Sequence, residues 1–167
     1  MKDVFLKSIL YGGMDGIITI FNIISSFSGL KINNAYTLIV TITVLIADAL
    51  SMGISDYNSY KAEQKLNNYS ASDPVVHGVI TFISFICFGV IPLLLYTIVT
   101  KYYKKNQYAM LLLTMSLAFF LLGIIQSRFT KEKWYEAGIS TVVYGDLTSI
   151  LAFFISNNLH AYFNFSK

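Results

Sequence analysis

Charged side chains are scarce in this sequence. Asp, Glu, Lys and Arg make up 13% of its 167 residues, 55% are hydrophobic, and the mean hydropathy is +0.60. A soluble domain carries about 25% charged residues, so this chain lacks the polar surface that a soluble fold needs. The net charge of +3 is too small, and too scattered, for a nucleic-acid-binding protein. The composition indicates an integral membrane protein.

Cysteine and the common catalytic motifs are also lacking. Cys87 is the single cysteine and lies in an apolar run, which excludes a disulfide framework. The sequence shows no nucleophile–base arrangement, phosphate-binding loop or cofactor motif, so we predict neither an enzyme nor a bound cofactor. No internal repeat is visible, and the first apolar segment has no signal-peptide cleavage site. We expect no soluble domain.

Long apolar segments, by contrast, are abundant. Each is about 20 residues or longer, the length that crosses the hydrocarbon core of a bilayer as a helix. Five are expected, at residues 8–29, 37–57, 75–100, 107–126 and 137–159. Asp73 followed by Pro74 marks the start of the third. We predict an all-α polytopic membrane protein with five transmembrane helices, with residues 1–167 forming one transmembrane domain.

The distribution of Lys and Arg over the polar joints predicts the orientation. With the N-terminus in the cytosol, seven basic residues lie on the cytosolic side and five on the other. The cytosolic set is Lys2, Lys7, Lys61, Lys65, Arg128, Lys131 and Lys133, and the opposite set is Lys31, Lys101, Lys104, Lys105 and Lys167. We therefore predict a cytosolic N-terminus and a lumenal or extracellular C-terminus.

Acidic residues occur inside the predicted spans. Asp48, Met52 and Asp56 follow one another at intervals of four residues, which places them on one face of a helix. Asp15 lies in the first span among three glycines. A charged side chain at the bilayer centre costs about 2.5–3.5 kcal/mol on insertion scales, so intramembrane acids are functional-site candidates. The alternative for Asp15 is a glycine-lined packing seam in which its carboxylate only caps or contacts a neighbouring helix.

Carboxylates together with a thioether suit a divalent transition metal. Carboxylates bind hard and borderline cations, and a thioether favours softer ions such as iron over calcium or magnesium. Asp15, Asp48 and Met52 are therefore predicted metal ligands, in a shell completed by water or by a second subunit. The acids are expected to hold protons when no metal is bound, so that arriving metal displaces them. A packing role is the alternative for Met52.

Other polar positions are assigned to the approach of metal or the relay of protons. Asp56 is predicted at the cytosolic mouth, and Glu63 beyond it. Asp146, in the last span, is predicted as a relay or gate residue, with a hydrogen-bonded helix contact as the alternative. His77 stands near the start of the third span, where we expect an interfacial histidine rather than a metal ligand.

The order of several short motifs resembles the vacuolar iron transporter (VIT/CCC1-like) family. Residues 13–16 (GMDG) resemble the family's first-span signature, and residues 47–57 (ADALSMGISDY) resemble its second-span signature. Further matches lie at residues 73–74, Phe85, Gly89, residues 92–94, Gly123, residues 128–129 and Trp134. The resemblance covers nearly the whole chain. It implies five transmembrane helices, a homodimer, and export of ferrous iron or related divalent metals from the cytosol in exchange for protons.

The resemblance also implies roles for particular residues. The family's metal-pathway aspartate falls on Asp15 and its pathway methionine on Met52. The family has a further acidic residue two turns before that methionine. In this sequence Val44 occupies that position. An arginine–aspartate pair of the family reads Lys7-Ser8.

The Glu-rich cytosolic metal-binding module that plant and fungal relatives insert between helices two and three has no counterpart in this sequence. The joint holds Glu63 as its single glutamate. We therefore do not expect a module of that kind to collect iron in the cytosol.

Taken together, the sequence predicts a transporter that moves Fe²⁺ or Mn²⁺ out of the cytosol in exchange for protons. Its partners are the divalent metal ion, protons, the lipid bilayer and a second copy of the chain. A passive cation or proton channel and a non-transporting membrane scaffold are the alternatives. The preferred metal and the membrane of residence, vacuole-like or plasma membrane, stay open.

Overall fold

The computed structural model describes residues 2–67, 73–103, 106–130 and 132–164. Across these residues the chain forms five helices, each of which contains one predicted span. They are α1 (Lys2–Gly29), α2 (Asn34–Asn67), α3 (Pro74–Tyr102), α4 (Gln107–Thr130) and α5 (Trp134–Asn164). All five are long and apolar enough to cross a membrane. The predicted all-α polytopic fold is confirmed.

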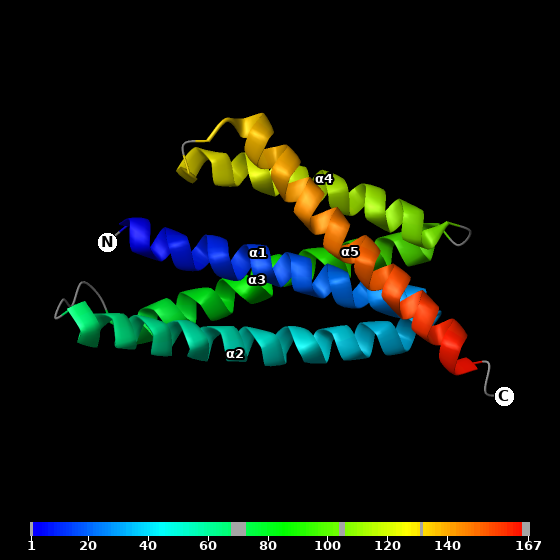
Figure 1. The fold of residues 1–167 in the computed structure, drawn as a ribbon, viewed down its shortest axis with the longest axis horizontal. Coiled ribbons are helices and arrows are strands. Elements are labelled where there is room, and N and C mark those ends of the chain that lie inside the picture. The colour runs from blue at the N-terminus through cyan, green and yellow to red at the C-terminus, as the bar shows by residue number, and fades with distance from the viewer. Residues whose placement is uncertain (1, 68–72, 104–105, 131, 165–167) are drawn as a thin grey trace.

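The helices alternate in direction, and α1 lies in the middle of the bundle (Figure 1). It packs most extensively against α3 and α5, while α2 packs against α3, and α4 packs against α5. The start of α1 lies at the same end of the molecule as the end of α2 and the start of α3 (Figure 1). The end of α5 lies at the opposite end of the molecule (Figure 1).

The helices extend beyond the predicted spans, most of all α2. This helix runs to Asn67, ten residues past the predicted span end at residue 57. At 1.5 Å per residue its 34 residues measure about 50 Å, which exceeds the hydrocarbon thickness of about 30 Å. Lys61 and Lys65 are exposed on this extension. The helix α2 is therefore long enough for its last turns to extend out of the hydrocarbon core into water.

The start of α3 agrees with the sequence signal. Asp73 has extended backbone angles, and its side chain accepts a 2.9 Å hydrogen bond from the backbone N–H of Val75. Pro74 occupies the first turn, where no intrahelical N–H partner is needed. The cap satisfies one of the N–H groups that a helix start leaves open.

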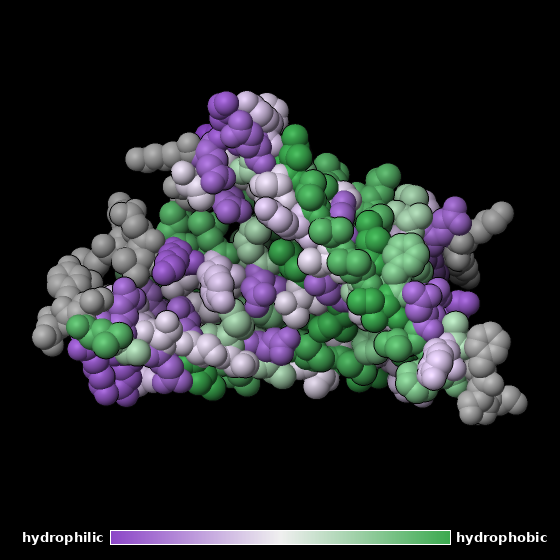
Figure 2. All heavy atoms as spheres, viewed as in Figure 1, coloured by the Kyte–Doolittle hydropathy of each residue, from purple (hydrophilic) through white to green (hydrophobic). Residues whose placement is uncertain are grey.

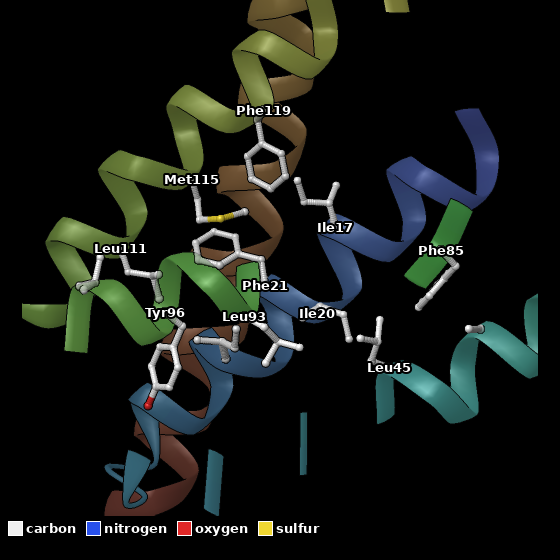
Figure 3. Packing of buried hydrophobic residues seen from close by; sticks show 13 residues of the cluster. Ile17, Ile20, Phe21, Leu45, Phe85, Leu93, Tyr96, Leu111, Met115 and Phe119 are labelled. Carbon is white, nitrogen blue, oxygen red and sulfur yellow. The ribbon is translucent and has the colours of Figure 1, made fainter. Parts of the chain in front are cut away.

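A hydrophobic core fills the space between α1, α3 and α4 (Figure 3). Phe21 of α1 and Phe119 of α4 are fully buried and meet edge to face, with ring centroids 5.8 Å apart. Met115 of α4 lies beside them (Figure 3). From α2, Leu45 and Ala49 join the same cluster. The core thus ties α4 to the α1–α3 pair.

Glycines bring the backbones of α1 and α3 into contact. A Cβ atom at Gly12 would lie 2.7 Å from the carbonyl oxygen of Thr81, and one at Gly16 would lie 2.5 Å from that of Phe85. Any larger residue would force these helices apart. The close contact fixes the position of Asp15, which directly precedes Gly16.

Candidate metal site and intramembrane acids

Asp15 of α1 and Asp48 of α2 are close enough for their charges to interact. Both side chains are half-buried. Thr19, one turn after Asp15, donates a 3.5 Å hydrogen bond from its hydroxyl to the Asp15 Oδ1 atom. The two acids that were predicted to share a metal therefore lie within electrostatic range of each other, on helices that pack together.

Met52 lies one turn after Asp48 on α2. Its side chain is half-buried and packs against the edge of the hydrophobic core. Asp48, Met52 and Asp56 all lie partly buried, as their spacing on one helix face requires. The thioether therefore stands between the Asp48 carboxylate and the buried acid that follows it.

The described part of the chain contains no group of three or more His, Cys, Asp or Glu side chains able to hold a metal ion. Two carboxylates and one thioether are fewer donors than divalent transition ions take. Further donors would have to come from water or from a second copy of the chain.

Polar side chains interrupt the apolar surface over α1 and α2 (Figure 2). Tyr11 of α1 is 61% exposed, and Ser51 and Ser55 of α2 are exposed as well. The middle of α5 is covered by hydrophobic side chains in the same view (Figure 2). On this face of the molecule, polar side chains are therefore more frequent over α1 and α2 than over the middle of α5.

Asp56 joins three helices through hydrogen bonds. Its Oδ2 atom accepts a 2.9 Å bond from the Ser8 hydroxyl of α1 and a 2.6 Å bond from the Thr81 hydroxyl of α3. The same Ser8 oxygen lies 3.2 Å from Nδ1 of His77. Helical spacing alone placed Asp56 on the face of Met52. Its partners come from positions 48 and 25 residues away and give no local sequence signal.

His77 is buried, with 1% of its surface exposed. This burial is by other helices of the protein, and the position of His77 at the membrane interface stays a prediction. Its imidazole stacks on Phe5 of α1 at a centroid distance of 5.1 Å and on Tyr60 of α2 at 3.9 Å. Because the extension of α2 carries Tyr60 over the start of α3, it covers a histidine that would otherwise face water.

Asp146 forms a separate polar contact between α5 and α4. Its Oδ2 atom accepts a 2.6 Å hydrogen bond from the Ser116 hydroxyl, and its Oδ1 atom is buried without a hydrogen-bond partner. The Tyr108 hydroxyl nearby donates a 3.3 Å bond to the backbone oxygen of Ser149. These contacts fit both predicted alternatives, a relay and a packing contact.

Glu63 is exposed on the α2 extension. It lies at the end of the molecule where α2 finishes and α3 begins (Figure 1). The structure does not place it among the buried acids.

The fold and these acids define a polytopic helical membrane protein with carboxylates at membrane depth. The model of the VIT family matches residues 6–72 and 65–157, and the chain belongs to this family. The resemblance seen in the short motifs is thereby confirmed.

Named relatives cover most of the chain. It is 26% identical to a protein named vacuolar iron transporter from Plasmodium berghei, over 89% of this chain and 80% of the relative. It is 25% identical to a protein of the same name from Plasmodium falciparum, over 90% and 80%. A third, from Toxoplasma gondii, is 40% identical over 36% of this chain and 20% of its own length. No solved structure matches the chain.

Proposed function

We propose that this protein transports a divalent transition metal, Fe²⁺ or Mn²⁺, out of the cytosol in exchange for protons. The observation that carries the proposal is the approach of Asp15 and Asp48 from two adjacent membrane-spanning helices. Relatives named vacuolar iron transporter support metal as the cargo.

The two acids need positive charge to lie together at membrane depth. Two carboxylates in a low-dielectric surrounding repel each other and lose hydration. Either protons or a divalent cation neutralises them. Metal and protons therefore compete for the same oxygens, since a carboxyl group must lose its proton to become a ligand. When the site opens first to one side of the membrane and then to the other, this competition exchanges metal for protons.

Met52 supplies the preference for a transition metal. Its thioether is a weak ligand for Ca²⁺ and Mg²⁺ and a better one for Fe²⁺. Because Met52 follows Asp48 by one helical turn, its sulfur can reach an ion held by that carboxylate.

We further propose a homodimer, with the α1–α2 surface as its interface. The open coordination shell and the exposed polar side chains Tyr11, Ser51 and Ser55 support this choice. A second copy would shield these groups from lipid and supply the missing donors. The N-terminus is proposed to face the cytosol. No enzymatic activity is proposed.

Proteoliposomes test the transport function directly. The purified full chain is reconstituted with a pH-sensitive dye inside, and Fe²⁺ or Mn²⁺ is added outside under conditions that keep it divalent. Metal flux with opposite proton movement supports the exchanger. Metal flux without proton movement supports the channel, and absence of flux supports the scaffold.

The variant Asp15→Asn tests the site. We expect metal flux to fall at least about tenfold, because the amide keeps the shape but not the charge that binds the ion. Glu136→Gln is the matched control, since Glu136 is exposed and pairs with Lys133 at 3.3 Å. Normal flux in Asp15→Asn would refute the assigned ligand.

A further inference from the structure

His77, Ser8 and Asp56 form a continuous hydrogen-bonded chain that no part of the metal site uses. The chain joins α3 to α1 to α2 through one serine oxygen, 3.2 Å from His77 Nδ1 and 2.9 Å from Asp56 Oδ2. Ser8 is 5% exposed and His77 1% exposed. Two titratable groups are therefore connected inside the protein through a hydroxyl group.

Counting hydrogens gives the direction of these bonds for the state in which Asp56 is a carboxylate. A serine hydroxyl has one hydrogen, and here it points to the Asp56 carboxylate. Toward His77 the Ser8 oxygen can then only accept, so the hydrogen between them belongs to Nδ1. Thr81 donates to the same Asp56 oxygen, which adds a second donor to the carboxylate. The arrangement is Nδ1–H to Ser8, and Ser8 to Asp56.

The same heavy atoms also allow the reverse arrangement. The step starts from an imidazolium ring, which carries a hydrogen on each nitrogen. When its Nδ1 proton moves to Ser8, the Ser8 hydrogen moves to Asp56, and the hydroxyl ends with one hydrogen as before. Asp56 is then a neutral acid, the ring is neutral with its hydrogen on Nε2, and Nδ1 becomes an acceptor. One proton has been passed from the imidazolium to the carboxylate.

Two aromatic rings flank the imidazole, and one acid is connected to it. The π-faces of Phe5 and Tyr60, which stack on it, attract a cation. Asp56 of α2 is the acid connected to it through Ser8, and Thr81 of α3 contacts that acid. The nearby cations Lys7 of α1 and Lys61 of α2 are exposed, and Lys61 bonds the Tyr57 hydroxyl at 3.2 Å.

We propose that His77, Ser8 and Asp56 constitute a proton-binding and proton-passing site at the end of the bundle where α1 begins. The inference rests on the proposed exchange of metal for protons and names the residues that handle the proton. Asp56 follows Met52 by one turn on the same face of α2, so a proton released there lies next to the metal ligands. The hydrogen-bonded chain thus ends at Asp56, one helical turn from the thioether-bearing Met52.

The first test separates proton from metal movement in the same proteoliposomes. In Ser8→Ala we expect the number of protons moved per metal ion to fall at least about tenfold, because the link between the two titratable groups is gone. Ser8→Thr keeps a hydroxyl and should retain the wild-type ratio. Ser140→Ala, an exposed serine of α5, is the matched control. A wild-type ratio in Ser8→Ala would overturn the proposal.

The second test does not depend on transport. The full chain contains two histidines, His77 and His160, so ¹⁵N-labelled histidine gives two sets of signals that a His160→Gln variant assigns. We expect His77 to show a protonated Nδ1 in the wild type and in Ser8→Thr, and to lose this signature in Ser8→Ala. No change of the His77 signals in Ser8→Ala would overturn the hydrogen-bonded chain.

The two tests also separate this inference from the proposed function. A wild-type protein that moves metal without protons refutes the exchange, and with it the role of the chain, whatever the NMR result. A wild-type exchanger whose ratio survives Ser8→Ala refutes the chain alone.

Discussion

Gly53 of α2 and Gly78 of α3 face each other where the two helices cross. A Cβ atom at Gly53 would lie 2.8 Å from the carbonyl oxygen of Gly78, and one at Gly78 would lie 2.6 Å from that of Gly53. Gly53 directly follows Met52, and Gly78 directly follows His77. The same backbone contact therefore sets the position of the metal-site thioether and of the buried imidazole.

A methyl group at this crossing should destabilise the protein. We expect Gly53→Ala to lose about 1–3 kcal/mol of stability, because its Cβ would meet backbone rather than a flexible side chain. Thermal unfolding in detergent, followed by size-exclusion chromatography, measures the loss. Ser140→Ala on the exposed side of α5 is the control and should behave as the wild type. Equal melting temperatures for both variants would contradict the close contact.

Replacing the thioether should change selectivity more than stability. Met52→Leu conserves volume and is expected to cost less than about 1.5 kcal/mol. The hydrocarbon offers no ligand, so Fe²⁺ flux should fall relative to Mn²⁺ flux, which depends more on the carboxylates. Competition between the two ions in proteoliposomes gives the ratio.

Met115→Leu is the matched control for this change, because Met115 is fully buried in the core between α1 and α4. It should leave the ion ratio unchanged. An unchanged ratio in Met52→Leu as well would show that Met52 only packs.

The contact between Ser116 and Asp146 can be tested with a double-mutant cycle. Ser116→Ala removes a 2.6 Å hydrogen bond from an acid whose other oxygen is already buried without a partner. We expect a loss of about 1–3 kcal/mol in stability for this variant. Ser116→Ala combined with Asp146→Leu should recover most of it, because no polar group is then left without a partner. Additive losses would mean that the two side chains do not interact.

Sidedness can be tested by labelling the two ends of α2. In a Cys87→Ala background, a membrane-impermeant maleimide should label Glu63→Cys from the cytosolic side and Ile32→Cys from the opposite side. Both positions are exposed, and the helix between them is longer than the hydrocarbon core. Labelling of both from one side would contradict a membrane-spanning α2. Labelling from reversed sides would keep the span and overturn the proposed orientation.

The helices could be predicted from the sequence because lipid imposes a length and a composition on each span. The start of α3 could be predicted from Asp73 and Pro74, because a helix cap is formed by residues that are adjacent in sequence. The C-terminal end of α2 was less predictable. Polar residues after Tyr57 ended the apolar pattern, although the helix continues to Asn67 in water-compatible residues.

The acids were predictable one at a time, and their neighbours were not. Spacing on one helix face places Asp48, Met52 and Asp56 together, but no spacing rule relates Asp15 to Asp48 across two helices. Ser8 was noted only as a departure from a family pattern. Its contacts with Asp56 and His77 depend on how α1, α2 and α3 pack, which is set by residues distant in sequence.

The opposite placement of the start of α1 and the end of α5 restricts how copies of this protein can be joined. Two copies in the same orientation put the end of α5 of one across the bilayer from the start of α1 of the next. A single-polypeptide tandem therefore needs an additional hydrophobic helix as its linker, whereas a flexible soluble linker would force the second copy to insert upside down.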